Sequence, residues 1–136
     1  MTVIVTDKGF HTEPSIPAFT ALSQLPYHEG ALDLANTDDP TALTAYLCDL
    51  RLIRIDFPGF ADGRGFTLGR RLRMMGYGGR LRARGHVLAD QYAMARRVGF
   101  DEVEITRELA ARQPVDQWLA RADWRAYDHQ SRLRAG

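Results

Sequence analysis

The feature that most constrains the fold is the regular alternation of strand-like and helix-like spacing of hydrophobic residues, which begins near Gly30. Runs with the alternating spacing of strands lie at 31–36, 51–57, 79–85 and 101–105. Helical spacing follows each run, over 40–50, 65–75, 86–98 and a last helix that begins at Pro114. Strands that take turns with helices over short connections predict an α/β fold with a mostly parallel sheet of four to five strands.

The same pattern divides the chain into three parts. Pro14, Pro17 and Pro26 fall within residues 1–30, so we expect an irregular N-terminal arm with one short strand in TVIV. Residues 31–128 are expected to form a single α/β domain, and residues 129–136 a C-terminal tail. The short strands fit two architectures, an open three-layer sheet or a half-barrel-like curved sheet. The second architecture would allow a homodimer.

Composition excludes several classes of function. A formal net charge of +1 on 136 residues gives no support to binding of nucleic acid or of an anionic membrane. No apolar run has the length of a membrane span and the N-terminus lacks a signal peptide, so we expect a cytoplasmic protein. One cysteine, Cys48, excludes an internal disulfide, and the four histidines show no metal-ligand spacing, so no metal site is expected.

Polar residues follow each expected strand, at the ends where parallel sheets bind their ligands. If the strands are parallel and adjacent, these residues converge on one rim. They are Asp33 and Asn36 after the first strand, Asp56, Asp62, Gly63, Arg64 and Gly65 after the second, Arg84, Gly85 and His86 after the third, and Thr106 and Arg107 after the fourth.

The sequence ADGRG, ahead of the second helix, allows two interpretations. Gly63 and Gly65 precede helical amides that lack partners, and Arg64 adds a bidentate donor, which favours an anion site. Arg82 and Arg84 would complete this site, with Asp56, Asp62 and Asp90 orienting the guanidinium groups. The alternative is an ordinary turn in which Asp62 caps the helix.

A dinucleotide fingerprint fits poorly, because Gly63, Gly65 and Gly69 have the spacing G-x-G-x-x-x-G and the strand ends well before them. An arginine at the next strand end, Arg84, would suit NADP better than NAD. The sequence therefore does not identify a cofactor.

His86 is the histidine that falls at an expected strand end, close to Asp90 in the next helical turn. A His–Asp pair can transfer protons near neutral pH, so His86 is a candidate catalytic residue. Asp62, at the neighbouring strand end, is the second candidate proton carrier. The alternative for His86 is a helix-cap histidine bonded to its neighbour. Asp90 and Gln91 either orient the site or lock the third helix to the loops.

Three motifs carry a resemblance to a known family. They are DFPGFADGRGFT at 56–67, GRLRARGHVLADQ at 79–91 and RVGFD at 97–101. Their combination resembles the bacterial domain-of-unknown-function 934 family, whose members are often labelled oxidoreductases. The genes of this family commonly lie beside those of assimilatory sulfite reductase, so the resemblance implies a role in sulfate assimilation and cysteine synthesis. Gly69 departs from the family pattern, in which an alanine is usual.

Three hypotheses follow. The first is an accessory protein of sulfite reduction that holds a small oxyanion, with sulfite reductase or another sulfate-assimilation protein as partner. The second is a small NADP- or flavin-dependent oxidoreductase acting at the same rim. The third is a non-catalytic interaction module. Redox chemistry needs a cofactor, a metal or paired thiols, and the sequence shows no convincing motif for any of them.

Overall fold

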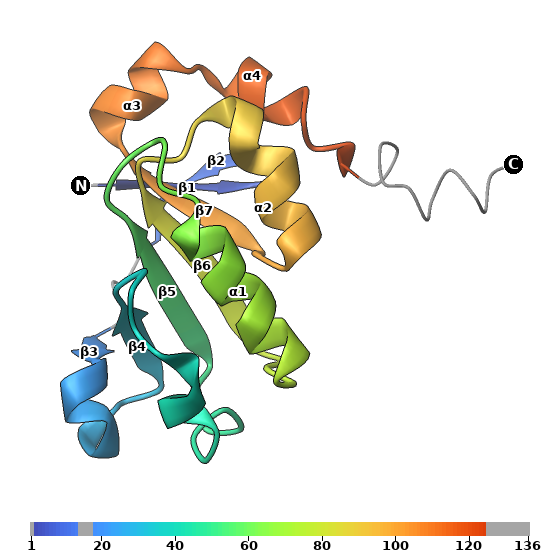
Figure 1. Ribbon diagram of the computed structural model, residues 1–136. Helices are drawn as coiled ribbons and strands as arrows, with labels where there is room; N and C mark the ends of the chain where they lie inside the picture. Colours follow the sequence, from blue (N-terminus) through green and yellow to red (C-terminus); the bar gives the residue numbers. More distant parts are fainter. Residues whose placement is uncertain (1, 14–17, 125–136) are drawn as a thin grey trace, which may run out of the picture.

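The computed structural model describes residues 2–13 and 18–124, and in this part seven strands form one sheet (Figure 1). The strand order is β2–β1–β7–β6–β5–β4–β3. Five strands run parallel: β3 (Phe19–Ala21), β4 (Ala31–Leu34), β5 (Leu52–Phe57), β6 (Arg80–Gly85) and β7 (Glu102–Thr106). β1 (Thr2–Thr6) pairs antiparallel with β7 on one side and with β2 (Gly9–His11) on the other. The α/β class is confirmed, with more strands than the four to five expected.

The helices form one layer beside the sheet. α1 (Arg64–Met74) and α2 (Tyr92–Val98) pack side by side against it, and α3 (Arg107–Arg112) and α4 (Val115–Leu119) pack near β1, β2 and β7 (Figure 1). From β3 to β7 each strand pairs with the next one along the chain, always in the same direction. Right-handed connections in such a sheet all pass over the same face. The arrangement therefore has two layers, and the three-layer alternative is wrong.

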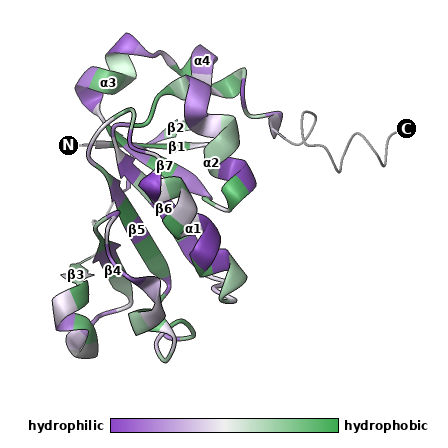
Figure 2. Ribbon diagram, viewed as in Figure 1, coloured by the Kyte–Doolittle hydropathy of each residue, from purple (hydrophilic) through white to green (hydrophobic). Residues whose placement is uncertain are grey.

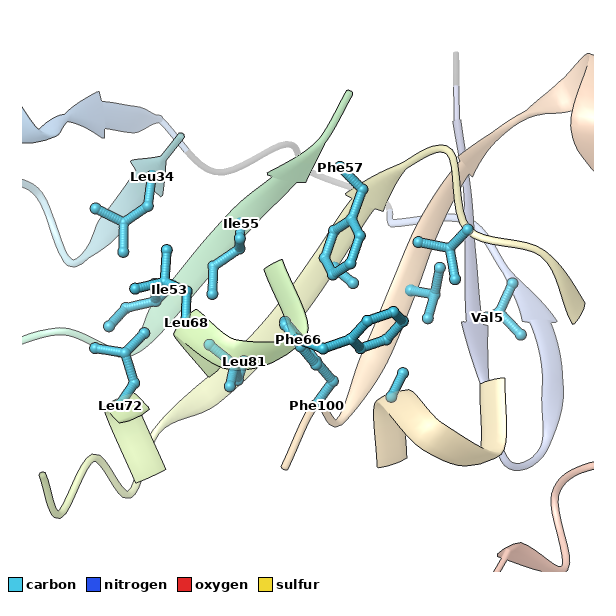
Figure 3. Packing of buried hydrophobic residues seen from close by; sticks show 14 of the residues in the cluster. Val5, Leu34, Ile53, Ile55, Phe57, Phe66, Leu68, Leu72, Leu81 and Phe100 are labelled. Carbon is cyan, nitrogen blue, oxygen red and sulfur yellow. The ribbon is translucent and has the colours of Figure 1, made fainter. Parts of the chain in front are cut away.

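The two faces of the sheet differ sharply in chemistry because side chains alternate along each strand. One face carries Ile53, Ile55, Phe57, Leu81 and Val103, which pack with Phe66, Leu68, Leu72 and Phe100 into the core (Figure 3). The intervening positions form what we call the charged face: Asp33, Arg54, Asp56, Arg80, Arg82, Arg84, Glu102 and Glu104. Hydrophilic residues accordingly interrupt the apolar colouring of β5 in Figure 2.

The sheet curves around its charged face. Six strand spacings of about 4.8 Å would place β2 about 29 Å from β3 in a flat sheet. The strand register increases this separation further. The pairing places His11 in register with Arg84 and Phe19 in register with Arg80, at different heights along β6. The chain from His11 to Phe19 reaches at most about 29 Å. Glu13 bonds to Arg80 and Arg82, so the chain leaves β2 over the charged face, and this face is the concave one.

Several expected boundaries are corrected. The strand expected in TVIV is β1, but the rest of the N-terminal arm is not irregular in its described part, because β2, β3 and a 3₁₀ helix at Leu22–Tyr27 also belong to the fold. The helix expected at 40–50 is a 3₁₀ turn over Pro40–Leu43, where the Asp39 side chain caps the backbone of Thr41. The Thr44 hydroxyl donates to the Thr41 carbonyl and so occupies a group that a longer helix would use.

Two further helix predictions are changed. The helix expected at 86–98 is a 3₁₀ turn at Ala89–Gln91 followed by α2, which Gly99 ends in the left-handed conformation. α3 was not expected, although Thr106 accepts from the Leu109 amide at 3.2 Å as its N-cap. The predicted tail at 129–136 lies outside the described residues.

Candidate functional site

The loop between β5 and α1 is organised around the carboxylate of Asp62. This carboxylate accepts from the backbone N and Nε of Arg64, each at 3.1 Å, and from Arg64 Nη2 at 2.9 Å. It also accepts from Asn36 Nδ2 at 2.7 Å, and Asn36 follows the neighbouring strand β4. The structure therefore brings Asn36, Asp62 and Arg64 together, as the position of parallel strand ends predicts.

The bonds from Arg64 lower the pKa of Asp62 to about 2. The side chain is therefore an ionised carboxylate at neutral pH, with its negative charge at the start of α1. A group that stays ionised across the physiological range is a poor proton carrier. This corrects the expectation that Asp62 transfers protons and makes it instead the group that orients Arg64.

The glycines of the loop serve close packing more than an open phosphate cradle. A Cβ atom on Gly65 would lie 2.5 Å from Cζ of Phe57, and one on Gly69 would lie 2.6 Å from Cε2 of Phe100. Gly63 precedes α1 with no atom within 4 Å of a Cβ built on it. The G-x-G-x-x-x-G spacing thus lets α1 approach two buried aromatic rings, and these glycines do not fit the pyrophosphate of a dinucleotide.

A pocket of about 370 Å³ lies between α1 and the loop that follows β4. Arg64, Thr67 and Arg71 line it from α1, and they share one stripe because they are three and four residues apart. Asn36, Thr37 and Asp38 line the opposite side. The side chains of Arg64 and Arg71 are 65% and 50% exposed, and Arg71 Nη2 lies 3.8 Å from Asp39 Oδ1.

His86 lies just beyond β6 and is held by a backbone group. Its Nδ1 is 3.2 Å from the carbonyl oxygen of Phe57, which can only accept, so Nδ1 carries the proton. The neutral ring then has its lone pair on Nε2. The ring of Phe60 packs edge-on against the imidazole, with 4.9 Å between centroids.

Asp90 and Gln91 do not orient the arginines of the site. Asp90 forms an ion pair with Arg121 instead of with His86. Gln91 accepts from the Leu88 amide at 2.9 Å and donates to the Phe60 carbonyl at 3.1 Å. Gln91 therefore has the second of the two roles expected for these residues, because its bonds hold the 3₁₀ turn at Ala89–Gln91 against the loop that contains Phe60.

Arg82 lies on the charged face, and the structure does not bring it to Arg64. Its side chain is 1% exposed and donates to Glu102 Oε2 at 3.0 Å, to Glu104 Oε1 at 2.8 Å and to Glu13. Three carboxylates therefore surround one buried guanidinium group. This corrects the expectation that Arg82 shares an anion with Arg64.

Arg84 and Asp56 sit side by side on β6 and β5 near the carboxyl edge of the charged face. Arg84 Nε lies 3.6 Å from Glu104 Oε2, and Asp56 forms no ion pair with Arg84 among the described residues. Both line a cavity of about 330 Å³ together with Asp33 and Asp38. This cavity shares Asp38 with the pocket of Arg64, but Asp56 and Arg84 line only this one, so the expected rim is divided between two neighbouring cavities.

The sequence interpretation missed Arg54 and its partners on the charged face. Arg54 Nε and Nη2 donate to Asp33 at 2.6 and 2.7 Å, and its guanidinium carbon lies 3.7 Å from the centroid of Phe19. The signal was present in the alternation of like charges, with arginine at 80, 82 and 84 and glutamate at 102 and 104. Such spacing places all these charges on one face of adjacent strands.

The described residues give no sign of a metal site or a membrane span. Residues 2–13 and 18–124 contain no group of three histidine, cysteine, aspartate or glutamate side chains that could hold a metal ion. No helix in this part of the chain is long and apolar enough to cross a membrane. Cys48 is exposed.

Residues 31–135 match a family described as a bacterial protein of unknown function, DUF934. The chain belongs to this family. The DUF934 region begins at the first residue of β4 and includes β5, β6, β7 and α1 to α4, whereas β1, β2 and β3 precede it. No protein with curated annotation and no solved structure matches the chain. The Arg64 pocket and His86 lie inside the DUF934 region, and Glu13 and Phe19 lie outside it.

Proposed function

We propose that this chain is an oxyanion-binding accessory protein of assimilatory sulfite reduction, with a role in sulfate assimilation and cysteine synthesis. The observation that carries the proposal is the pocket in which Arg64, Thr67 and Arg71 form one stripe of α1. The resemblance of the chain to a family whose genes accompany sulfite reductase supports the physiological context.

The chemistry of the pocket suits a small oxyanion such as sulfite or sulfate. Two exposed guanidinium groups supply planar, bidentate donors, and the Thr67 hydroxyl supplies another donor between them. Asp62 engages Nε and Nη2 of Arg64 and thereby fixes the direction of the guanidinium group. Because the pocket lies along the first turns of α1, the positive end of the helix dipole adds to the attraction.

Calorimetric titration with sulfite, sulfate and phosphate at low ionic strength tests the proposal. Wild type and Arg70→Ala should bind at least one of these anions saturably, because Arg70 is exposed on α1 but does not line the pocket. Arg64→Ala and Arg71→Ala should each weaken binding about tenfold or more, as expected when one charge-assisted donor is lost. Equal affinities in all four proteins, or no saturable binding in wild type, would contradict the proposed site.

Two observations on the purified protein address the partner. If the accessory role is correct, sulfite reductase or another sulfate-assimilation protein should co-purify with this protein. Arg64→Ala, which weakens anion binding, should then weaken the association to the extent that the association depends on the bound anion. Association that survives Arg64→Ala unchanged, without any anion binding, would instead favour the non-catalytic interaction module.

A small oxidoreductase remains the second candidate, and the geometry of His86 favours it. An exposed imidazole whose Nδ1–H is held by a carbonyl presents Nε2 as a proton acceptor at the rim. Absorbance from a flavin or a nicotinamide nucleotide in the purified protein would support this candidate. The packing of Gly65 and Gly69 against Phe57 and Phe100 does not fit a dinucleotide at the start of α1, so we derive no step through such a cofactor.

A further inference from the structure

The carboxylate of Glu13 occupies a position between two arginines of β6. It accepts from Arg80 Nη2 at 3.0 Å and from Nη2 of Arg82. The other carboxylates that Arg82 contacts, Glu102 and Glu104, come from β7 in the same sheet. Glu13 alone of these acids lies outside the strands, and it also lies outside the DUF934 region.

Open space flanks this carboxylate on both sides. One cavity of about 440 Å³ is lined by Glu13, Arg54, Arg82, Glu104, Phe19 and Arg107. Another of about 510 Å³ is lined by Glu13, Arg80, Glu102, His11 and Lys8, among others. Glu13 therefore lines both cavities.

We propose that Arg80 and Arg82 form a carboxylate-binding site on the concave charged face, which the side chain of Glu13 fills until a small carboxylate ligand exchanges with it. The resident group already has the geometry of the ligand, since two guanidinium nitrogens converge on one carboxylate. The arginine and glutamate residues of β6 and β7 remain in place when the exchange occurs.

Electrostatics favours an anion at this position, as a third carboxylate beside Glu102 and Glu104. Arg82 is almost fully buried, and a buried guanidinium group is costly unless carboxylates and hydrogen bonds compensate it. Burial alone would raise the pKa of Glu13, but the hydrogen bonds from Arg80 and Arg82 outweigh this and lower it, which keeps the group ionised. An external carboxylate that takes the same two donors restores the same balance.

The exchange implies that Glu13 competes with the ligand. A binding-competent state that is populated only in part weakens the apparent affinity by that fraction. Glu13→Ala, which empties the position, should therefore bind acetate roughly tenfold or more tightly than wild type does. Glu13→Gln, which keeps the shape but not the charge, should show a smaller gain.

The test is a comparison of thermal unfolding and calorimetric titration in sodium acetate and in sodium chloride at equal ionic strength. Glu13→Ala should be stabilised saturably by acetate and not by chloride, whereas wild type and the control Glu108→Ala, exposed on α3, should respond far less. The double variant Glu13→Ala, Arg80→Ala should lose the acetate response. Arg64→Ala should leave it unchanged, which separates this site from the proposed oxyanion pocket.

Three outcomes would overturn the proposal: an equal acetate response in wild type and Glu13→Ala, a response that persists without Arg80, or a response reproduced by chloride. If Glu13→Ala does not fold in chloride, circular dichroism during an acetate titration decides the matter. Recovery of the folded signal supports the site, and failure to recover it, together with no gain in Glu13→Gln, refutes the site.

Discussion

Arg54 reaches Glu104 across an entire strand. Its Nη1 lies 3.2 and 3.1 Å from the two carboxylate oxygens, although β6 separates β5 from β7. The side chains are 13% and 6% exposed, and Arg54 also holds Asp33 of β4. One guanidinium group on the concave face therefore ties three strands of the curved sheet together.

The first prediction is that Arg54→Ala destabilises the protein by about 3 kcal/mol or more, because it leaves Glu104 buried with fewer positive partners and removes the contact with Phe19. Urea unfolding followed by circular dichroism measures this loss. Arg70→Ala, on the exposed side of α1, is the matched control and should change the free energy of unfolding by about 0.5 kcal/mol or less. Equal effects of the two substitutions would mean that the bridge contributes little.

A second prediction concerns the approach of α1 to the sheet. Gly65→Ala should destabilise the protein by about 1–3 kcal/mol, because the new methyl group would lie 2.5 Å from the buried ring of Phe57. Gly63→Ala, two residues earlier and with no atom within 4 Å of its Cβ, should be nearly neutral. Denaturant midpoints of the two variants provide the comparison. A larger loss for Gly63→Ala would contradict the packing role assigned to Gly65.

The strands β4 to β7 and α1 were predictable because each has a clear period over its length, and the TVIV run predicted β1. β2 and β3 were not predicted, since they have three residues each and depend on pairing with β1 and β4. α3 has only six residues, too few to display a helical stripe. Long-range pairing, which local spacing does not record, supplied these elements.

The residues of the candidate site were predictable only where they directly follow the ends of adjacent parallel strands. The strand-end rule placed Asn36, Asp62 and Arg64 together, because adjacent parallel strands end at one edge. The expectation that Arg82 completes the site failed, because a side chain three residues before the end of β6 can be buried on the face instead of reaching the rim. Nor did chain position single out Arg73, which donates to the carbonyls of Gly99, Tyr77 and Gly79.

The third prediction is a pH-dependent contribution of Asp7, in the turn between β1 and β2. Burial raises its pKa, but hydrogen bonds from Tyr92 and Arg96 outweigh burial and lower it below the ordinary 3.8. A carboxyl whose pKa is lower in the folded state stabilises the protein above its unfolded pKa. The stabilisation disappears as the pH falls through the folded pKa.

Urea unfolding of wild type and Asp7→Asn between about pH 7 and pH 2 checks this dependence. The difference in the free energy of unfolding should be constant near neutrality and should shrink below 3.8. Tyr92→Phe removes one of the donors and should reduce the pH dependence without abolishing it. A difference that stays constant to the lowest pH would show that Asp7 acts through packing alone.

The last prediction follows from the competition between Asp62 and an external anion for Arg64. Asp62→Asn retains an oxygen that can accept from the Arg64 amide, but it removes the negative charge beside the pocket. A unit charge about 4 Å away changes binding in water by about 1 kcal/mol, so oxyanion affinity should rise about fivefold. Because the pKa of Asp62 is about 2, this gain should be the same throughout the neutral range. Titration of both proteins with phosphate at two salt concentrations should show the gain shrinking at high salt, as screening requires. Weaker binding in Asp62→Asn would instead mean that the orientation of Arg64 by the carboxylate matters more than the charge it adds.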